Sequence, residues 1–461
     1  MKVAIVGAGW AGMAAAVELC NNGHTATVFE ASKSIGGRAR GVNTILPNGK
    51  EVVLDNGQHI LIGAYTECLA LMRRVGVDPA QVLLNQSLCL KFSDNTGLQF
   101  PKLPAPLDAL FGILGASGWT MGDKTSLLKA ALGWQIAGFQ CAQDTSVAEL
   151  CRPLSKRVLT ELIEPLCVSA LNTPASRASA GVFLRVLKDA LFSSAGGSRL
   201  LLPRVDLSRL FPQAAADWLQ SQGGRIELGV RVREISYGQT STGHETNTKT
   251  WRVNDLPFDA VILATSSTDA NFILSVSMSD APESIALQIF QEDVNAWCNC
   301  AAELKFEAIT TVYAWAESAS LARPMLTLRS HQETAPAQFA FDRGQLAGQD
   351  QQGLIAFVVS ASQQSREETQ NLVLQQAHSQ LGLNLQAVQT VVEKRATFAC
   401  TPGLVRPSQI IGPGLLACGD YVRGPYPATL EGAVRSGLSA ARLLMPHGNK
   451  LADASGLQQS T

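Results

Sequence analysis

Short apolar runs separated by more mixed stretches form the pattern at the start of the chain. Lys2–Val6 is apolar after its first residue and predicts a buried strand, and Thr25–Phe29 predicts a second strand. The stretch between them has the length and pattern of a helix. Strand, helix and strand in this order predict a βαβ unit within a parallel sheet.

Similar elements return in two later parts of the chain. Asp259–Thr265 predicts a buried strand, and Thr429–Leu444 predicts a helix. Gly224–Leu228 and Val230–Ile235 predict paired strands, and a variable loop is expected at Tyr237–Thr250. We therefore expect one discontinuous nucleotide-binding domain, made of residues 1–95, 205–270 and 395–446.

Two inserted blocks interrupt this domain. Residues 96–204 are mostly helical by pattern and predict a helical cap, while residues 271–394 alternate strands and helices and predict a mixed-sheet substrate domain. The polar tail at residues 447–461 is expected to be flexible. The predicted fold class is thus α/β, a Rossmann-like domain with an inserted mixed-sheet domain and a helical cap.

Composition narrows the class of protein. With 461 residues the chain is too long for one ordinary core, and 46% hydrophobic against 16% charged residues indicates a large apolar cavity or surface. The net charge of −1 gives no electrostatic reason to expect nucleic acid. No apolar run reaches the 18 residues of a membrane span.

The cysteines and the N-terminus indicate a compartment. The ten cysteines include no C-x-x-C pair, and Cys298 and Cys300 are too close together for ordinary metal-ligand spacing, so we expect no metal site. They are typical of buried residues in a reducing cytoplasm. The first strand begins at residue 2 and leaves no room for a signal peptide, so a cytoplasmic location is expected.

The G-A-G-W-A-G motif at residues 7–12 directly follows the first strand. Gly7 permits a tight turn, Gly9 lets a pyrophosphate approach the backbone, and Gly12 lets the helix pack closely on the strands. The helix N-terminus offers its N–H groups to phosphates. Glu30, at the end of the second strand, can accept hydrogen bonds from ribose hydroxyls, which favours FAD or NAD over a 2′-phosphorylated cofactor.

Two further motifs extend this nucleotide site. The arginines of Gly36–Arg40 are expected to contact a pyrophosphate. Ala417–Asp420 ends an apolar strand, and Pro427–Gly437 opens a helix whose N–H groups can face the pyrimidine edge of a flavin. Asp420 would accept hydrogen bonds from ribityl hydroxyls.

With these motifs the chain resembles the FAD-dependent amine oxidase and carotenoid desaturase superfamily over nearly its whole length. The resemblance implies an FAD domain of the glutathione-reductase type, and non-covalent FAD because no cysteine stands where the flavinylated members carry theirs. The residues expected to bind FAD are Gly7, Gly9, Trp10, Ala11, Gly12, Glu30, Gly37, Arg38, Val232, Asp420 and Glu431.

Three stretches resemble the squalene-associated branch of this superfamily, the hydroxysqualene dehydroxylases. They are Leu54–His59, Arg395–Gly403 and Pro427–Ala433, while Tyr421 departs from the tryptophan that this branch implies. The resemblance implies that reduced FAD converts hydroxysqualene to squalene and water. A C30 isoprenoid is then the substrate, and association with squalene-pathway synthases is a further expectation.

Such a reaction needs a proton donor for the departing hydroxyl, a dry cavity and a positioned hydride. His59 is the first candidate donor, because its motif follows an apolar strand and histidine can donate near neutral pH. The alternative is that His59 only hydrogen-bonds the backbone or the flavin. Gln58 and Tyr421 are further candidate site residues, and Asp55 is expected to form a turn.

The helical block contains a candidate membrane contact. Ala109–Gly122 lacks charge, and Lys102, Lys124 and Lys129 flank or follow it, which suits an interfacial segment on the cytoplasmic membrane. The alternative is a pair of ordinary buried cap helices.

Other functions remain open at this point. A carotenoid desaturase would use the same scaffold with oxidised FAD. A flavin amine oxidase is disfavoured, because neither aromatic-cage tyrosines nor a flavin-facing lysine can be identified. A non-catalytic flavoprotein would not require the intact flavin-contact residues, and an NAD-only dehydrogenase would leave the C-terminal motif unexplained.

Overall fold

The computed structural model describes residues 1–191, 196–239, 249–278 and 285–445. The βαβ unit predicted at the start of the chain is confirmed as β1 (Lys2–Val6), α1 (Trp10–Asn21) and β2 (Thr25–Glu30). β1 and β2 pair in parallel, with Lys2 opposite Thr25. The four side chains from Val3 to Val6 are buried, as expected for a central strand that is covered on both faces.

Distant segments of the chain complete one six-stranded sheet. Its order is β10 (Arg225–Leu228), β2, β1, β14 (Ala260–Leu263), β21 (Leu415–Ala417) and β20 (Ile410–Gly412). The pairs from β10 to β21 are parallel, and β20 runs antiparallel to β21. The direction of winding reverses between β1 and β14, and ligands bind at the carboxyl ends of strands beside such a switch point.

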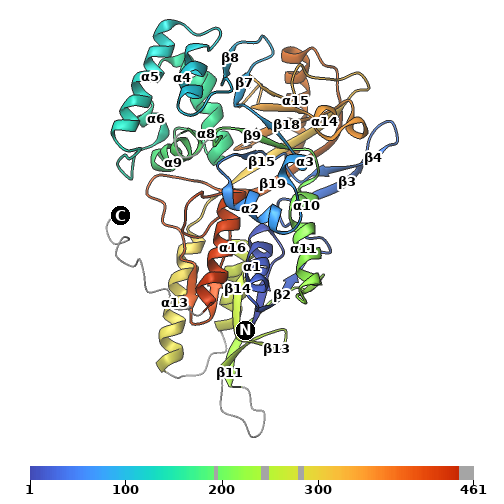
Figure 1. Cartoon of the computed structure of the whole chain (residues 1–461), viewed down its shortest axis with the longest axis vertical. Coiled ribbons are helices and arrows are strands. Elements are labelled where there is room, and N and C mark those ends of the chain that lie inside the picture. The colour runs from blue at the N-terminus through green and yellow to red at the C-terminus, as the bar shows by residue number, and fades with distance from the viewer. Residues whose placement is uncertain (192–195, 240–248, 279–284, 446–461) are drawn as a thin grey trace.

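Helices α11 (Pro212–Ser221) and α16 (Leu430–Leu444) lie with α1 beside this sheet (Figure 1). The contact between α1 and α16 is close, since a Cβ added at Gly437 would lie 2.1 Å from the carbonyl oxygen of Ala11. Helix α13 (Ile285–Ala302) follows α12 (Ser267–Met278). It also lies beside the first sheet, because the indole N–H of its Trp297 donates to the carbonyl oxygen of Ser408, which precedes β20.

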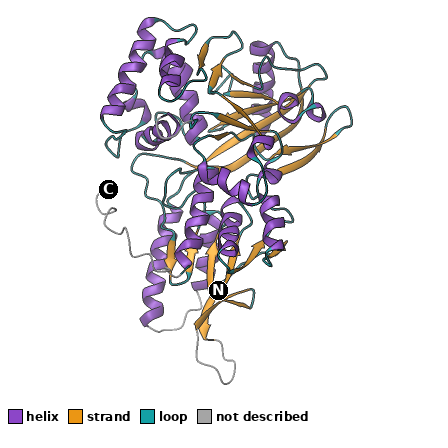
Figure 2. Ribbon diagram, in the orientation of Figure 1, coloured by secondary structure: helices purple, strands orange, loops and turns teal. Residues whose placement is uncertain are grey.

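A second sheet of five antiparallel strands lies beyond the carboxyl ends of the first one (Figure 2). The order is β16 (Met325–Thr327), β17 (Phe339–Asp342), β18 (Leu354–Ser360), β15 (Phe306–Trp315) and β19 (Gln386–Phe398). The alternation of strands and helices expected in residues 271–394 is thus confirmed in β15, in β18 and in the helix α15 (Arg366–Leu381).

A helical block stands beside this second sheet (Figure 1). It consists of α4 (Leu107–Leu114), α5 (Met121–Ile136), α6 (Val147–Leu150), α7 (Lys156–Val158), the π-helix η1 (Leu159–Ile163), α8 (Glu164–Leu171) and α9 (Ala180–Leu191). The smaller elements are β3 (Gly41–Ile45), β4 (Glu51–Asp55), β5 (Leu61–Ile62), α2 (Thr66–Arg74), α3 (Pro79–Val82), β6 (Leu83–Gln86), β7 (Cys89–Lys91), β8 (Gly97–Gln99), β9 (Leu200–Pro203), α10 (Leu207–Leu210), β11 (Ile235–Gln239), β12 (Lys249–Val253), β13 (Leu256–Phe258), α14 (Arg343–Ala347) and the 3-10 helix η2 (Gln349–Gln351).

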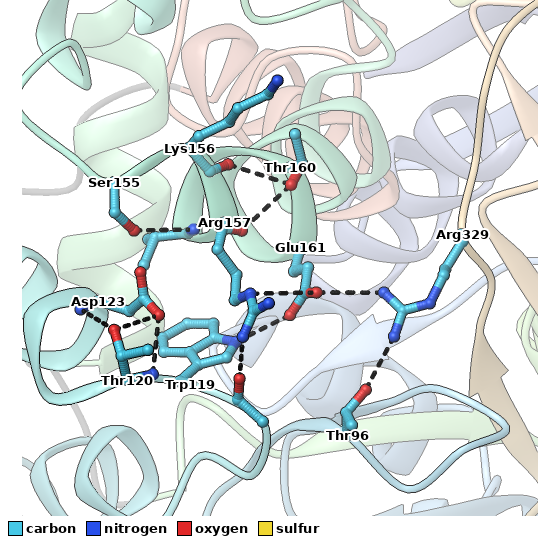
Figure 3. Close-up of polar contacts among 12 residues, drawn as sticks. Thr96, Trp119, Thr120, Asp123, Ser155, Lys156, Arg157, Thr160, Glu161 and Arg329 are labelled. Atoms are coloured by element: carbon cyan, nitrogen blue, oxygen red, sulfur yellow. Dashed lines mark hydrogen bonds and ion pairs between the residues drawn. The ribbon is translucent and has the colours of Figure 1, made fainter.

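A polar network joins the helical block to the second sheet (Figure 3). The carboxylate of Glu161, in the π-helix, accepts hydrogen bonds from the indole N–H of Trp119 at 2.9 Å and from Arg329 at 3.1 Å. Arg329 follows β16 and also donates to Thr96 and to Asp94, beside the β7–β8 hairpin. One arginine thus ties three segments together.

The structure corrects several predicted elements. The strand predicted at 230–235 is wrong, because Gly229 and Val230 donate to Ser32 and Glu30 after β10 and carry the chain across the end of β2. The predicted loop at 237–250 contains the ends of β11 and β12, and its residues 240–248 lie outside the described ranges. Strand β19 crosses the boundary expected at 394/395, and α13 lies beside the first sheet rather than in the substrate domain. The C-terminal tail lies outside the described residues.

Candidate active site

A cavity of about 680 Å³ runs from the β1–α1 turn to the face of the five-stranded sheet. Its walls come from the turn after β1, residues 36–40, residues 56–60 after β4 and the start of α16. On the sheet side the wall carries the apolar residues Ile309, Phe339, Phe341 and Val358, together with the polar residues Ser360, Glu393 and Thr397. The cavity therefore joins an end lined by backbone and polar groups to an end that suits a hydrocarbon.

The β1–α1 turn exposes bare backbone to this cavity. Gly7 has a φ of +112°, and a Cβ on it would lie 2.7 Å from the carbonyl oxygen of Ala264. Gly9 is the N-cap of α1 and no side chain caps the helix, so the first N–H groups of α1 are open to an anion. The residues of the turn that line the cavity are Gly7, Gly9, Trp10 and Ala11.

Gly12 packs against the same turn on the side away from the cavity. A Cβ at this position would lie 2.0 Å from the carbonyl oxygen of Gly7, so only glycine lets α1 pack this closely on the end of β1. Gly12 is not among the cavity-lining residues. Its contribution is to the packing that shapes the turn, as its place in the motif predicts.

Glu30 ends β2 on the cavity wall. Its Oε2 accepts the N–H of Ala8 and its Oε1 accepts the N–H of Ser32, both at 2.8 Å. These two bonds hold the carboxylate beside the turn, and each oxygen keeps a lone pair for a ribose hydroxyl. Val232 lines the same cavity, because the segment after β10 crosses the end of β2.

Arg38 and Asp420 were predicted at different parts of a flavin nucleotide and lie together on the wall. Nη2 of Arg38 is 2.5 Å from Oδ1 of Asp420, and Arg38 also donates to the carbonyl oxygen of Ala396. The negative charge of Asp420 raises the pKa of Arg38, so the guanidinium stays charged. Gly37 lines the cavity next to this pair.

Tyr421 was a candidate site residue, but it does not line the cavity. Its side chain is buried and its ring packs against Trp297, with 6.4 Å between the ring centroids and 73° between the planes. The chain turns at Gly419 and directs the aromatic side chain toward α13 instead of the cavity wall. Tyr421 therefore contributes packing beside the site.

Glu431 was expected to bind FAD, but its side chain does not line the cavity. Its fully buried carboxylate accepts the N–H groups of Glu67 at 3.0 Å and Cys68 at 2.9 Å, and pairs with Arg435 at 2.7 Å. It thereby caps α2, whose own N-cap residue makes no side-chain cap. The neighbours of Glu431 on α16 line the cavity, and its carboxylate does not.

Gln58 and His59 lie in the cavity wall, as predicted for a segment that follows an apolar strand. Nδ1 of His59 is 2.6 Å from the carbonyl oxygen of Gly57. A carbonyl oxygen only accepts, so Nδ1 carries the proton and Nε2 of the neutral ring is an acceptor. Burial lowers the pKa of His59, which keeps the ring neutral at pH 7. This geometry favours a hydrogen-bond acceptor over the predicted proton donor.

Sequence reasoning missed Tyr65 as a wall residue. Tyr65 lines the cavity, and burial raises the pKa of its phenol, which therefore keeps its proton. Tyr426 lies beside it, with 6.4 Å between the ring centroids. No local motif marks Tyr65, because its position depends on the long-range pairing of β5 with β9, where Leu61 lies opposite Leu201. Asn172 and Glu393 of distant elements join the wall in the same way.

These residues fit a flavin nucleotide. The uncapped N-terminus of α1 can hold a pyrophosphate, Glu30 a ribose and Asp420 the ribityl hydroxyls, and the apolar end of the cavity begins beyond them. The fold and the site define a flavin-dependent oxidoreductase. The family model described as flavin containing amine oxidoreductase matches residues 10–445, and the chain belongs to this family. FAD is its cofactor, and supplies hydride transfer when bound.

The chain is also similar in sequence to proteins named as hydroxysqualene dehydroxylases and to one named as a probable carotene desaturase. The chain is 26% identical to a hydroxysqualene dehydroxylase of Rhodopseudomonas palustris, over 97% of this chain and 99% of the relative, and 25% identical to one of Zymomonas mobilis, over 96% and 99%. A probable zeta-carotene desaturase of Synechococcus elongatus is 26% identical over 52% of each chain. An oxidoreductase of Methanosarcina mazei has the same fold, with a TM-score of 0.65 and 15% identity over 96% of this chain and 100% of that one.

Proposed function

We propose that this protein removes the hydroxyl group of hydroxysqualene reductively and releases squalene and water. Similarity over nearly the full length of the hydroxysqualene dehydroxylases carries the proposal, whereas the similarity to the carotene desaturase covers about half of each chain. In the balanced reaction a hydride from reduced FAD takes the place of the hydroxyl on carbon. The hydroxyl leaves with one proton as water.

The cavity wall supports this chemistry with the partners that a hydroxyl needs. The phenol of Tyr65 can donate a hydrogen bond to the oxygen, and Nε2 of His59 can accept one from it. Ile309, Phe339 and Phe341 offer an apolar surface to the isoprenoid chain and exclude water from the reacting carbon.

The decisive experiment is anaerobic. The purified flavoprotein is photoreduced and mixed with hydroxysqualene, and we expect the flavin absorbance near 450 nm to return as squalene forms in equal amount. Squalene in place of hydroxysqualene is the control and should leave the flavin reduced. A flavin that stays reduced with hydroxysqualene would contradict the proposal.

A carotenoid desaturase is the second candidate, supported by the match to the Synechococcus protein. It would bind a polyene at the same apolar surface and pass hydride in the opposite direction. Oxidised enzyme with phytoene and a quinone separates the two functions. Desaturated product there, together with no reaction in the anaerobic experiment, would favour the second candidate.

We further propose that the helical block contacts a membrane surface, from which a C30 hydrocarbon would be collected. Helix α4 packs inward with Ala109 and Ile113, while its opposite side is open to solvent. We define an apolar face by eight large hydrophobic side chains, each 38–79% exposed: Leu103, Leu107, Leu110, Phe111, Leu114, Met121, Leu132 and Ile136. Lys102 and Lys129 lie nearby in the sequence and suit anionic headgroups.

This surface lies at one end of the molecule, where α4 and α5 project away from the first sheet (Figure 1). None of the helices in the described ranges is long and apolar enough to cross a bilayer, so the proposed contact is peripheral. A location at the cytoplasmic face of a membrane stays a proposal, and association with squalene-pathway synthases stays a prediction.

The variant Phe111→Asp/Ile136→Asp is expected to bind vesicles at least about tenfold less than the unchanged protein, because two apolar side chains worth about 1.5–3 kcal/mol each are replaced by charges. The measurement is co-sedimentation with vesicles of phosphatidylglycerol and phosphatidylethanolamine. Leu256→Asp is the matched control, since Leu256 is similarly exposed, at 52%, but lies in β13, outside the helical block. Equal vesicle binding of the double variant and the unchanged protein would contradict the proposal.

A further inference from the structure

A buried arginine stands behind the cavity wall. Arg343, the first residue of α14, is 1% exposed. Its Nε donates to Oε1 of Gln351 at 2.9 Å, its Nη1 donates to Oε1 of Gln58 at 3.2 Å, and its Nη2 has no hydrogen-bond partner among the described residues. The hydrogen-bond partners of this charge are thus neutral amides. Burying a charge with only neutral partners costs free energy, so the arrangement indicates a role for Arg343 beyond packing.

Asp55 provides the opposite charge nearby. It was expected to form a turn, but it ends β4 with an exposure of 1%, and its Oδ1 accepts the N–H of Leu207 at 2.8 Å. Its Oδ2 has no hydrogen-bond partner among the described residues. Burial raises the pKa of Asp55 to about 7, the charge of Arg343 opposes this rise, and Asp206 adds to it. The phenol of Tyr313 donates a hydrogen bond to the backbone carbonyl oxygen of Asp55 at 3.0 Å.

Gln58 connects this buried pair with the cavity. Its Oε1 accepts from Arg343, its Nε2 donates to the carbonyl oxygen of His59 at 3.2 Å, and its backbone N–H donates to Oγ1 of Thr311. The same segment contains the bond from His59 to Gly57 that sets the ring tautomer. Arg343 is therefore two hydrogen bonds away from the backbone of the histidine in the wall.

We propose that Arg343 is a positioning residue, which holds Gln58 and through it keeps His59 in its Nδ1–H tautomer at the cavity wall. The neutral partners then have a reason, because one N–H of Arg343 holds the amide oxygen of Gln58 while the guanidinium charge still opposes the rise in the pKa of Asp55. The effect of Arg343 on turnover rests on the proposed function, whereas its effect on His59 does not.

The first test follows His59 itself. The protein has six histidines, so long-range proton–nitrogen spectra of the FAD-loaded, ¹⁵N-histidine-labelled protein can be assigned with the variant His59→Gln. In Gln58→Leu, which removes the acceptor, we expect mixed tautomers and a pKa of His59 that rises toward the ordinary value of about 6.5. Arg343→Met/Asp55→Asn removes both buried charges together and should reproduce this change without leaving either charge alone.

Two further variants separate positioning from general damage. Gln351→Leu removes the other amide partner of Arg343. The Nε2 of Gln351 donates to the carbonyl oxygen of Val53 in β4 rather than to the His59 segment, so this variant should leave the His59 signals unchanged. Arg343→Lys keeps the charge, and it should retain more of the native His59 tautomer than the double variant Arg343→Met/Asp55→Asn does. If Gln58→Leu and the double variant, folded and yellow, keep the native titration of His59, the proposal is overturned.

The second test is turnover of photoreduced enzyme with hydroxysqualene. The same two variants should lose about 10- to 100-fold in kcat, as expected for a group displaced by about 1 Å, with KM nearly unchanged because the apolar wall still binds the chain. If the His59 signals change but the unaltered enzyme does not reduce hydroxysqualene, only the proposed function fails. If turnover is native in both variants, the positioning role is overturned.

Discussion

Gly12→Ala is expected to abolish the retention of flavin, although Gly12 does not line the cavity. A Cβ at this position would lie 2.0 Å from the carbonyl oxygen of Gly7 and 3.0 Å from Cβ of Ala264. Since real contacts of this kind exceed 3 Å, α1 must move by about 1 Å or more relative to β1. That movement displaces the uncapped helix N-terminus from the position at which it can hold a pyrophosphate.

The measurement is the affinity of the apoprotein for FAD, together with the FAD content after purification. We expect the affinity to fall at least about 100-fold, which corresponds to about 2.7 kcal/mol. Gly133→Ala is the matched control, because nothing lies within 4 Å of a Cβ at this exposed position in α5, and alanine favours a helix by about 0.5–1 kcal/mol. A yellow Gly12→Ala protein with native affinity would show that the close packing is not required.

Glu431→Ala should produce the second large effect, on stability. The substitution leaves the N–H groups of Glu67 and Cys68 without their acceptor and removes the carboxylate from the ion pair with Arg435. A buried donor left unsatisfied costs about 1–3 kcal/mol, so the free energy of unfolding should fall by about 3 kcal/mol. Because Glu431 ties α2 to the start of α16, FAD should also bind more weakly.

Urea unfolding of the FAD-loaded proteins measures this loss. Glu149→Ala is the control, because Glu149 has a similar capping role at the N-terminus of α6 but in an exposed position, and should cost about 0.5–1 kcal/mol. A loss for Glu431→Ala no larger than that of the control would contradict a buried capping role and would return Glu431 to the candidates for cofactor contact.

The contrast between Glu30 and Glu431 shows how far a motif can locate a side chain. Both acids were predicted at the cofactor from their motifs, and only Glu30 lines the cavity. Glu30 ends a strand that pairs directly with β1, so local geometry places it beside the turn. Glu431 stands on a helix, and its direction depends on α2, a contact between residues 364 positions apart in the sequence.

Strand pairing explains the errors in the remaining elements. Apolar runs locate β1, β14 and β18 because burial on both faces leaves a continuous signal. The segment after β10 is also apolar at Val230 and Val232, yet it crosses the end of β2 through two backbone bonds instead of pairing with β10. Such bonds use groups that every residue carries, so side-chain patterns do not reveal them.

The amino-acid sequence by itself determined the βαβ unit, the glycine turn and the family, since these depend on residues close together along the chain and on backbone conformations that few residue types adopt. Only the tertiary structure decided which side chains form the wall: it added Tyr65, withdrew Tyr421 and Glu431, and placed Arg343 behind Gln58. The physical reason is that burial and hydrogen-bond partners at this site come from segments up to several hundred residues apart, and their meeting is a property of the packed fold.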